Sequence, residues 1–265
     1  MSVDPRAAVS KKAKIASDVD VGPFAVIEDE VEIASGVKIW PHAHISNGVS
    51  IGEGTQIHTG AAIGDIPQDL AFKNTRTFVN IGKRNVIREY VTIHRGTADG
   101  SSTVIGDDCY LMAVAHVGHN CRLGNNVIVA NGALLAGYVE VGDKAFISGN
   151  VVIHQFCRIG ELSMIGGFSG INKDVPPYML VRGPSVVRTL NLVGLRRAKV
   201  ARDAMHALKE AFRLIYASGM NTSQALVEIK KLPVSPEITN LIKFIEESKR
   251  GICKSKASDE EYFGE

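Results

Sequence analysis

Two histidines and an asparagine form the stretch whose residue types could do acid–base chemistry. His116, His119 and Asn120 lie together in the segment 115–121, AHVGHNC. An imidazole exchanges protons near neutral pH, so an outward-facing histidine could act as a general base toward a hydroxyl group. Asn120 could orient the ring of His119. The alternative is a pair of inert surface histidines. The apolar residues around the pair favour a site.

A repeat of six residues must position these side chains. An aliphatic residue occupies every sixth position from Ile105 to Ile171, and the same phase holds from Ile15 to Ile63. A fixed short period is typical of a solenoid whose aliphatic residues line the interior. His116, His119 and His154 fall off the inward positions, so we expect all three on the outside.

The repeat stops after Pro176-Pro177, which predicts two domains, a β solenoid over residues 1–184 and a helical region over 185–265. Helical periodicity runs from 203 to 217 and returns after Thr222, a candidate N-cap. Ser235-Pro236 is expected to open the last helix. The polar, acidic tail beyond Cys253 is expected to be disordered.

Composition excludes several classes of protein. The 265 residues are 45% hydrophobic and 22% charged with a net charge of +2, which argues against a nucleic-acid binder. No apolar run approaches about 18 residues, so we expect no membrane span. The first residues lack a signal-peptide core, so a cytoplasmic location is expected. There is no CxxC motif, and neither a metal nor a cofactor is predicted.

Two inserts and one apolar wall depart from the regular repeat. One insert lies between Ile63 and Ile81, and the other follows Ile93. Inserts in repeat proteins usually gather on one functional face. In the run 111–117, LMAVAHV, the residues Met112, Ala113 and Val114 must lie outside or at a corner. Such an apolar wall is expected to be covered by another subunit.

Five motifs together resemble one known family. They are IGD with QDL at 63–70, IHRGT at 93–97, AHVGHNC at 115–121, IHQFC at 153–157 and DVPPY at 174–178. The set resembles the UDP-N-acetylglucosamine acyltransferases that begin lipid A synthesis, over about residues 13–250. The resemblance implies a mostly β fold, a left-handed parallel β-helix with three strands per turn, followed by a small helical domain. With repeats counted from Ile15, the helix would have about eight turns. A homotrimer is also implied.

The resemblance also implies a reaction and its residues. An (R)-3-hydroxyacyl chain would pass from acyl carrier protein to the glucosamine 3-hydroxyl of UDP-N-acetylglucosamine. His119 would be the general base, Asn120 would orient it, and the backbone N–H of Gly137 would hold the oxyanion. Other residues would contact the acceptor and its nucleotide: Gln68, Asp69, His94, His116, Tyr138, His154, Gln155, Asn191 and Arg197.

A groove for the acyl chain is predicted from residues 18 apart, which stack if a turn has three strands. Gly149 and Gly167 then share a column without side chains, and Met112 lies in the neighbouring column. By the resemblance, Met164 and Gly167 correspond to positions that set acyl length. Since Gly167 cannot block the groove, we expect a chain longer than about ten carbons. The alternative is that these glycines only form corners.

Several positions differ from the family pattern. Asn120 stands where the family has aspartate, and Tyr138 stands where it has histidine. Because these two positions stack, the changes are expected to be coupled. Val193, Ala198 and Ala71 also depart from the pattern. They leave open whether the acceptor is a 3-hydroxyl or a 3-amino group.

Three other functions were weighed. The N-acyltransferase of the same pathway carries an extra N-terminal domain, for which repeats starting at Ile15 leave no room. A gamma-class carbonic anhydrase needs a histidine pair five apart, whereas His116 and His119 are three apart and His42 and His44 two apart. A non-catalytic solenoid is the third.

A basic cluster marks the junction with the helices, and it is either a solvated face or a docking surface for the acidic carrier protein. Its members are Arg182, Arg188, Arg196, Arg197, Lys199 and Arg202.

Overall fold

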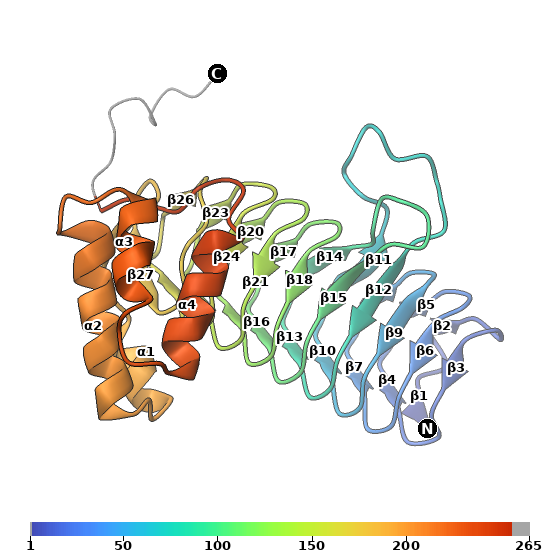
Figure 1. Ribbon diagram of the computed structural model, residues 1–265. Helices are drawn as coiled ribbons and strands as arrows, with labels where there is room; N and C mark the ends of the chain where they lie inside the picture. The colour runs from blue at the N-terminus through green and yellow to red at the C-terminus, as the bar shows by residue number, and fades with distance from the viewer. Residues whose placement is uncertain (1, 256–265) are drawn as a thin grey trace.

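The computed structural model describes residues 2–255 and consists of 28 short strands followed by four helices (Figure 1). Most strands are only two residues long, and each is followed by a corner. The coil and the helical end that the sequence predicted are both confirmed. The predicted tail beyond Cys253 lies, from residue 256 on, outside the described residues.

The strands form three sheets that run along the coil. The first, 11-stranded sheet contains β1 (Ser2–Val3), β4 (Asp20–Val21), β7 (Lys38–Ile39), β10 (Gln56–Ile57), β13 (Val86–Ile87), β16 (Tyr110–Leu111), β19 (Ile128–Val129), β22 (Phe146–Ile147), β25 (Met164–Ile165), β27 (Met179–Arg182) and β28 (Val186–Leu190). The second, 9-stranded sheet contains β2 (Ala8–Val9), β5 (Val26–Ile27), β8 (His44–Ile45), β11 (Ala62–Asp65), β14 (Thr92–His94), β17 (His116–Val117), β20 (Leu134–Leu135), β23 (Val152–Ile153) and β26 (Gly170–Ile171). The third, 8-stranded sheet contains β3 (Lys14–Ile15), β6 (Glu32–Ile33), β9 (Val49–Ile51), β12 (Phe78–Ile81), β15 (Ser102–Ile105), β18 (Arg122–Leu123), β21 (Glu140–Val141) and β24 (Arg158–Ile159).

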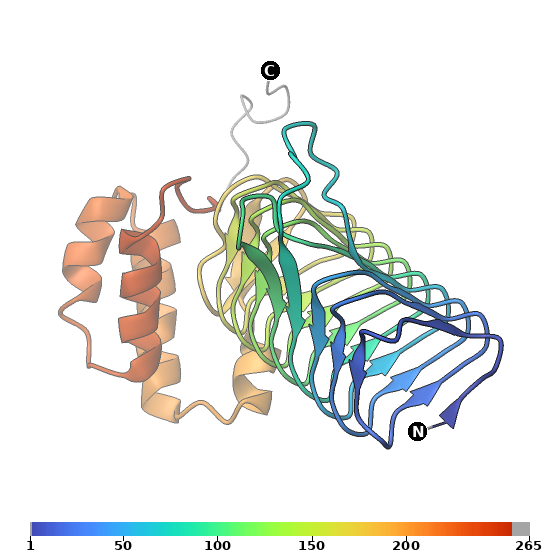
Figure 2. The same ribbon diagram turned by 90° about the vertical axis from the view of Figure 1, so that its right-hand side faces the viewer.

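Successive coils stack in register, as Figure 2 shows in the view turned by 90°. His116 pairs with Leu134, and Leu134 pairs with Val152, in a parallel ladder with a step of 18 residues. This register confirms three strands per turn. The predicted start of the coil at Ile15 is wrong, because β1 and β2 already pair with β4 and β5. The left hand of the coil stays a prediction.

The six-residue period arises because one residue points inward and a tight corner follows. Val117 and Leu135 are fully buried inside the coil. Corner residues take positive φ even when they are not glycine, as Val114, Asn120 and Asn126 do. That conformation normally costs a non-glycine residue energy, so the surrounding ladder must enforce it.

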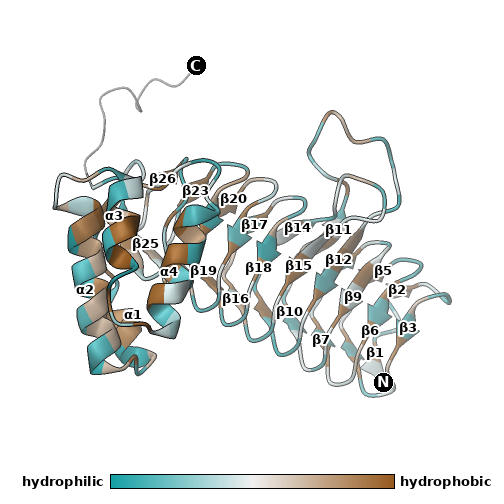
Figure 3. Cartoon of the chain, in the orientation of Figure 1, coloured by the Kyte–Doolittle hydropathy of each residue, from teal (hydrophilic) through white to brown (hydrophobic). Residues whose placement is uncertain are grey.

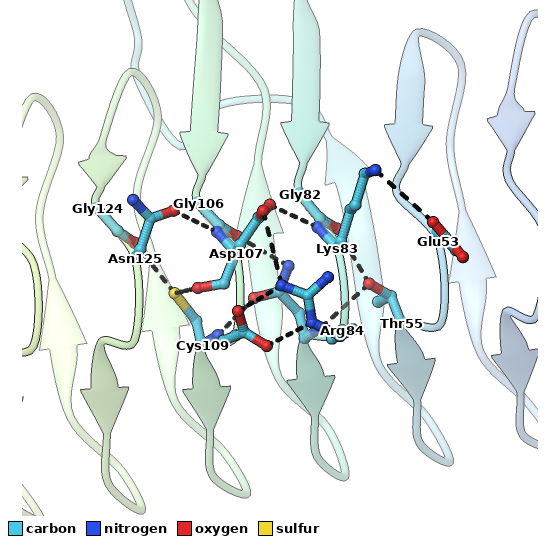
Figure 4. Close-up of polar contacts among 12 residues, drawn as sticks. Glu53, Thr55, Gly82, Lys83, Arg84, Gly106, Asp107, Cys109, Gly124 and Asn125 are labelled. Carbon is cyan, nitrogen blue, oxygen red and sulfur yellow. Dashed lines mark hydrogen bonds and ion pairs between the residues drawn. The ribbon is translucent and has the colours of Figure 1, made fainter.

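Asx side chains join neighbouring coils at the corner between the third and first sheets (Figure 4). The N–H of Lys83 donates to Asp107, the N–H of Asp107 to Asn125, and the N–H of Asn125 to Asp143, each at 2.8 Å. Each side-chain carboxylate or amide oxygen thus accepts a hydrogen bond from a backbone N–H that, at the corner, has no partner in the strand ladder. The nearby Cys109 thiol is buried and donates to the Gly124 carbonyl, so it acts as a small core residue.

The two inserts form adjoining loops that project from the coil beside β11, β12 and β14 (Figure 1). The first insert occupies residues 66–77 and the second 95–101. They contact each other, since the N–H of Gly100 donates to the Arg76 carbonyl at 2.8 Å and Thr75 Oγ1 donates to the Thr97 carbonyl at 2.9 Å. The inserts therefore lie on one face of the coil, as expected.

The helical region lies at the C-terminal end of the coil. It contains α1 (Leu192–Arg197), α2 (Arg202–Tyr216), α3 (Thr222–Ile229) and α4 (Pro236–Glu246), which carry hydrophobic residues on one side (Figure 3). The expected N-cap of α3 is wrong, because Asn221 caps that helix and exchanges hydrogen bonds with Gln224. Ser235 caps α4 as predicted. No helix between residues 2 and 255 is both long and apolar enough to cross a membrane. The domain boundary at 184 stays a prediction and falls between β27 and β28, which pair antiparallel.

Candidate active site

The candidate site lies at the corner between the second and third sheets. β17 ends at Val117, and the chain turns through His119 and Asn120 before β18 begins. One turn on, Gly137 and Tyr138 occupy the same corner, and the N–H of Tyr138 donates to the His119 carbonyl at 2.9 Å. The 18-residue step therefore brings these four residues together, as the sequence predicted.

Asn120 orients the ring of His119. Its Oδ1 lies 3.1 Å from His119 Nδ1. The amide oxygen only accepts hydrogen bonds, so Nδ1 must carry the proton and Nε2 must carry the lone pair. Nε2 has no hydrogen-bond partner among the described residues. His119 can therefore accept a proton from a bound molecule through Nε2.

The same amide oxygen receives two further hydrogen bonds from the second insert. The backbone N–H of Thr97 donates to Asn120 Oδ1 at 3.0 Å and its Oγ1 at 2.9 Å. Asn120 Nδ2 in turn donates to Ser101 Oγ at 3.1 Å. Thr97 Oγ1 also lies 2.8 Å from the Tyr138 hydroxyl. The expected coupling between positions 120 and 138 thus has a physical route through Thr97.

Gly137 supports the imidazole from the next turn. A Cβ at this position would overlap the Cε1 and Nε2 atoms of His119, so only glycine leaves room for the ring. Within residues 2–255, the N–H of Gly137 has no hydrogen-bond acceptor. A free backbone donor beside a base is the arrangement that stabilises an oxyanion.

His94, in β14, and His116, in β17, lie on the second sheet beside the corner that carries His119. Both are neutral at neutral pH. Their rings meet edge to face with centroids 4.9 Å apart. Burial, together with the nearby His94 and His119, lowers the pKa of His116 to about 4. Burial also lowers the pKa of His94. His116 Nδ1 lies 2.7 Å from Thr92 Oγ1, which fixes the ring. Neutral imidazoles of this kind can bind hydroxyl groups by hydrogen bonds.

Aromatic rings and exposed polar groups extend the site over the next turn. Tyr138 meets His119 edge to face at 5.3 Å and stacks on Phe156 at 4.8 Å. His154 and Gln155 are exposed in the same turn, and His154 Nδ1 lies 3.0 Å from the Gln155 carbonyl.

Several predicted site residues lie away from this corner in a single chain. Gln68 and Asp69 are in the projecting first insert, where Asp69 Oδ1 accepts the N–H of Ala71. Asn191 caps α1 and Arg197 ends it, and this helix lies at the C-terminal end of the coil, away from the inserts (Figure 1). Asn191 is buried; its side chain caps α1 and donates to the Leu162 carbonyl. The substrate contacts of Gln68 and Asp69 and the nucleotide contacts of Asn191 and Arg197 stay predictions.

The predicted acyl-groove residues lie along the first sheet and at its corner with the second. Met112 follows β16, Met164 lies in β25, and Gly149 and Gly167 precede the corner residues Asn150 and Phe168. They are thus separated from His119 by the width of the second sheet within one chain.

Gly149 and Gly167 are the first residues of the two-residue turns at these corners. The positive φ angles belong to Asn150 and Phe168, the second residues of the turns. A Cβ at Gly149 would meet the Asn131 carbonyl at 3.3 Å, and one at Gly167 would meet the Gly149 carbonyl at 3.4 Å. Both glycines therefore belong to corners, and the groove stays a prediction.

Thr97 and Ser101 are polar partners of the site that sequence reasoning did not find. Both lie in the second insert, outside the six-residue period, so stacking arithmetic could not place them. The only available signal was the position of Thr97 in the IHRGT motif.

The described residues 2–255 contain no group of three or more His, Cys, Asp or Glu side chains arranged to hold a metal ion. Instead, His94 and His116 contact each other, His116 also contacts Thr92, and His119 contacts Asn120.

Two family models match this chain. Residues 174–253 match the model described as "Udp N-acetylglucosamine O-acyltransferase; Domain 2", and residues 102–137 match the bacterial transferase hexapeptide model of six repeats. The first match covers the helical end and the second covers the coils that carry His119.

Similar proteins span nearly the whole chain. The acyl-[acyl-carrier-protein]–UDP-N-acetylglucosamine O-acyltransferase of Pseudomonas entomophila is 45% identical over 256 residues, which is 96% of this chain and 99% of that protein. The same-named protein of Synechocystis is 48% identical over 193 residues, 72% of this chain and 70% of its own length. The crystal structure of the UDP-N-acetylglucosamine acyltransferase from Bacteroides fragilis superposes with a TM-score of 0.91 at 42% identity, covering 94% of this chain and 99% of the other.

Proposed function

This chain belongs to the UDP-N-acetylglucosamine O-acyltransferase family, and from this premise we propose that it transfers an (R)-3-hydroxyacyl chain from acyl carrier protein to the 3-position of UDP-N-acetylglucosamine, the first step of lipid A synthesis. The observation that carries the proposal is the pairing of His119, whose Nε2 is free to accept a proton, with the unpaired N–H of Gly137 beside it.

The proposed chemistry follows from these two groups. His119 Nε2 removes the proton of the 3-hydroxyl as that oxygen attacks the thioester carbonyl. The negative charge that develops on the carbonyl oxygen is stabilised by the Gly137 N–H. The C–S bond then breaks, and the imidazolium returns its proton to the departing carrier thiolate.

A trimer of identical chains would complete the site. Hydrophobic side chains on the second sheet and its corner with the first are exposed in one chain: Val114 by 59%, Leu134 by 43%, Val152 by 52% and Phe168 by 82%. The third sheet instead presents Arg122, Glu140 and Arg158. We therefore place the second sheet against the first sheet of a neighbouring copy, because an apolar face of this size needs a cover. The neighbour would then supply the groove and nucleotide residues that His119 lacks in its own chain.

The first test is the identity of the product. Incubation with 3-hydroxyacyl carrier protein and UDP-N-acetylglucosamine should give a product whose mass equals that of UDP-N-acetylglucosamine plus that of the 3-hydroxy acid, minus water. The 3-amino analogue of the sugar is the matched acceptor, and faster acylation of that analogue would assign the amine instead, the alternative that Asn120 and Tyr138 leave open. Absence of product with both acceptors would contradict the proposal.

Acyl-chain length tests the groove. We expect donors longer than about ten carbons to react fastest, because Gly167 leaves the column open. Gly167→Met places a flexible side chain in that column and should shift the preference to shorter donors by several carbons. Competition between donors, read by product mass, measures the shift. A wild-type preference for a short donor would rule out the open groove.

The basic cluster at the junction fits the acidic carrier protein. Its six residues make no ion pair within residues 2–255, and Arg196 and Arg197 are exposed at the end of α1. Salt reduces the Debye length from about 10 Å at 0.1 M to about 3 Å at 1 M. Raising salt should therefore increase KM for the protein-bound donor but not for a small acyl thioester. Equal salt dependence of both donors would show that the cluster is only solvated.

A further inference from the structure

We propose that Thr97 is a positioning residue for His119, and that it acts by holding the Asn120 amide in the one orientation that leaves His119 Nε2 free. The inference rests on the proposed role of His119 as base. It adds a residue of the second insert to the site around His119. Thr97 is given this role neither by the sequence alone nor by the family pattern.

The need for such a residue follows from the chemistry of an amide. A carboxylate offers two equivalent oxygens to a histidine, so rotation by 180° changes nothing. An amide has one acceptor end and one donor end, and only the acceptor end leaves the proton on His119 Nδ1. If Asn120 turned its Nδ2 toward the ring, the proton would have to move to Nε2. His119 could then no longer accept a proton there.

The backbone of Thr97 selects the required orientation. Its N–H can only donate, and it lies 3.0 Å from Asn120 Oδ1. Rotation of the amide would place two donors against each other at this contact. At the other end, Asn120 Nδ2 donates to Ser101 Oγ at 3.1 Å. The backbone donor of Thr97 thus assigns the oxygen end of the amide, and the Ser101 hydroxyl, which can accept or donate, is compatible with that orientation.

The hydroxyl of Thr97 adds a directed chain of hydrogen bonds. Asn120 Oδ1 cannot donate, so Thr97 Oγ1 must donate to it across 2.9 Å. The Tyr138 hydroxyl, 2.8 Å from Oγ1, must then donate to Thr97. The chain runs from Tyr138 through Thr97 to Asn120, and the donation from His119 Nδ1 ends at the same oxygen. A neutral tyrosine at position 138 thus supports a neutral amide at position 120.

The insert is held firmly enough to act in this way. The Thr97 carbonyl accepts Thr75 Oγ1 at 2.9 Å, and the N–H of Gly100 donates to Arg76 in the first insert. Asn120 itself has a positive φ, and its N–H donates at 2.8 Å to Oγ1 of Thr103, which lies in β15, the strand that follows the insert.

Replacement of the Thr97 hydroxyl tests the proposal. Thr97→Val should lower kcat about 3- to 10-fold, the effect of one lost orienting hydrogen bond, with KM changed less than about twofold. Thr97→Ser restores the hydroxyl and should recover most of kcat. Thr97→Val combined with Tyr138→Phe should be no worse than Thr97→Val alone, because both break the same chain. Thr239→Val is the matched control, since it removes an exposed hydroxyl from α4 that makes no hydrogen bond within residues 2–255.

A second measurement does not depend on turnover. The side-chain 15N chemical shifts of His119, assigned by their loss in His119→Ala, report which nitrogen carries the proton. We expect the Nδ1–H form in the wild type and in Thr239→Val, and a smaller share of that form in Thr97→Val, which keeps only the backbone donor to Asn120. Unchanged shifts and unchanged kcat in Thr97→Val would overturn the positioning role of the hydroxyl. Activity retained in His119→Ala would instead refute the proposed base, and the shifts would still judge Thr97.

Discussion

Replacing His119 with alanine should lower kcat by about 10²- to 10⁴-fold, the usual contribution of a positioned general base. KM for UDP-N-acetylglucosamine should change little, because His94 and His116, the proposed acceptor contacts, remain. The loss of kcat is expected because Asn120 keeps the lone pair of His119 on Nε2, whereas burial lowers the pKa of His94 and His116 and makes them weaker bases. Steady-state kinetics with 3-hydroxyacyl carrier protein as donor measures both kcat and KM.

The controls separate loss of the base from loss of the fold. His206→Ala removes an exposed imidazole from α2 and should leave kcat within about twofold of wild type. Light scattering should give the mass of three chains for wild type and for both variants, since His119 is not part of the apolar wall. A His119→Ala enzyme that keeps more than a tenth of wild-type kcat would mean that another group takes the proton.

The period of six residues predicted most of the fold because it records a geometric constraint. An interior that admits one aliphatic side chain per strand, as at Val117 and Leu135, must repeat at every strand. The start of the coil was misplaced although Val3 and Val9 continue the phase, because the repeat was counted only from Ile15. The N-cap of α3 was misplaced by one residue, since Asn221 and Thr222 are both good caps and only the contact with Gln224 decides between them.

The site was predictable only where it follows the ladder. Stacking at 18 residues placed His119 beside Gly137, and the structure brings Asn120 and Tyr138 to the same corner. Thr97 could not be placed, because a loop outside the repeat has no fixed phase. The caps and carbonyl contacts of Asn191 were also invisible in the sequence, since α1 is a short helix without an amphipathic pattern.

Gly137→Ala is the second change for which we expect a large effect, because one methyl group must displace the base. The added Cβ would overlap Cε1 and Nε2 of His119, whose ring is held from the other side by Asn120. The ring must rotate or shift, and a displacement of about 1 Å in a reacting group can lower the rate about 10²-fold. The N–H of residue 137 is retained, so the loss in kcat would come from the position of the base rather than from the oxyanion donor.

Ser223→Ala provides the control for this change. Ser223 is exposed in α3, away from the corner of His119 and from the second sheet, and its side chain makes no hydrogen bond within residues 2–255. It should leave kcat and the melting temperature unchanged, whereas Gly137→Ala should lower kcat with little change in melting temperature, because the overlap is with a surface imidazole and not with the core. If kcat of Gly137→Ala stayed within about threefold of wild type, the ring would have free space that the structure does not show, and the assignment of His119 and Gly137 to one reacting centre would have to be abandoned.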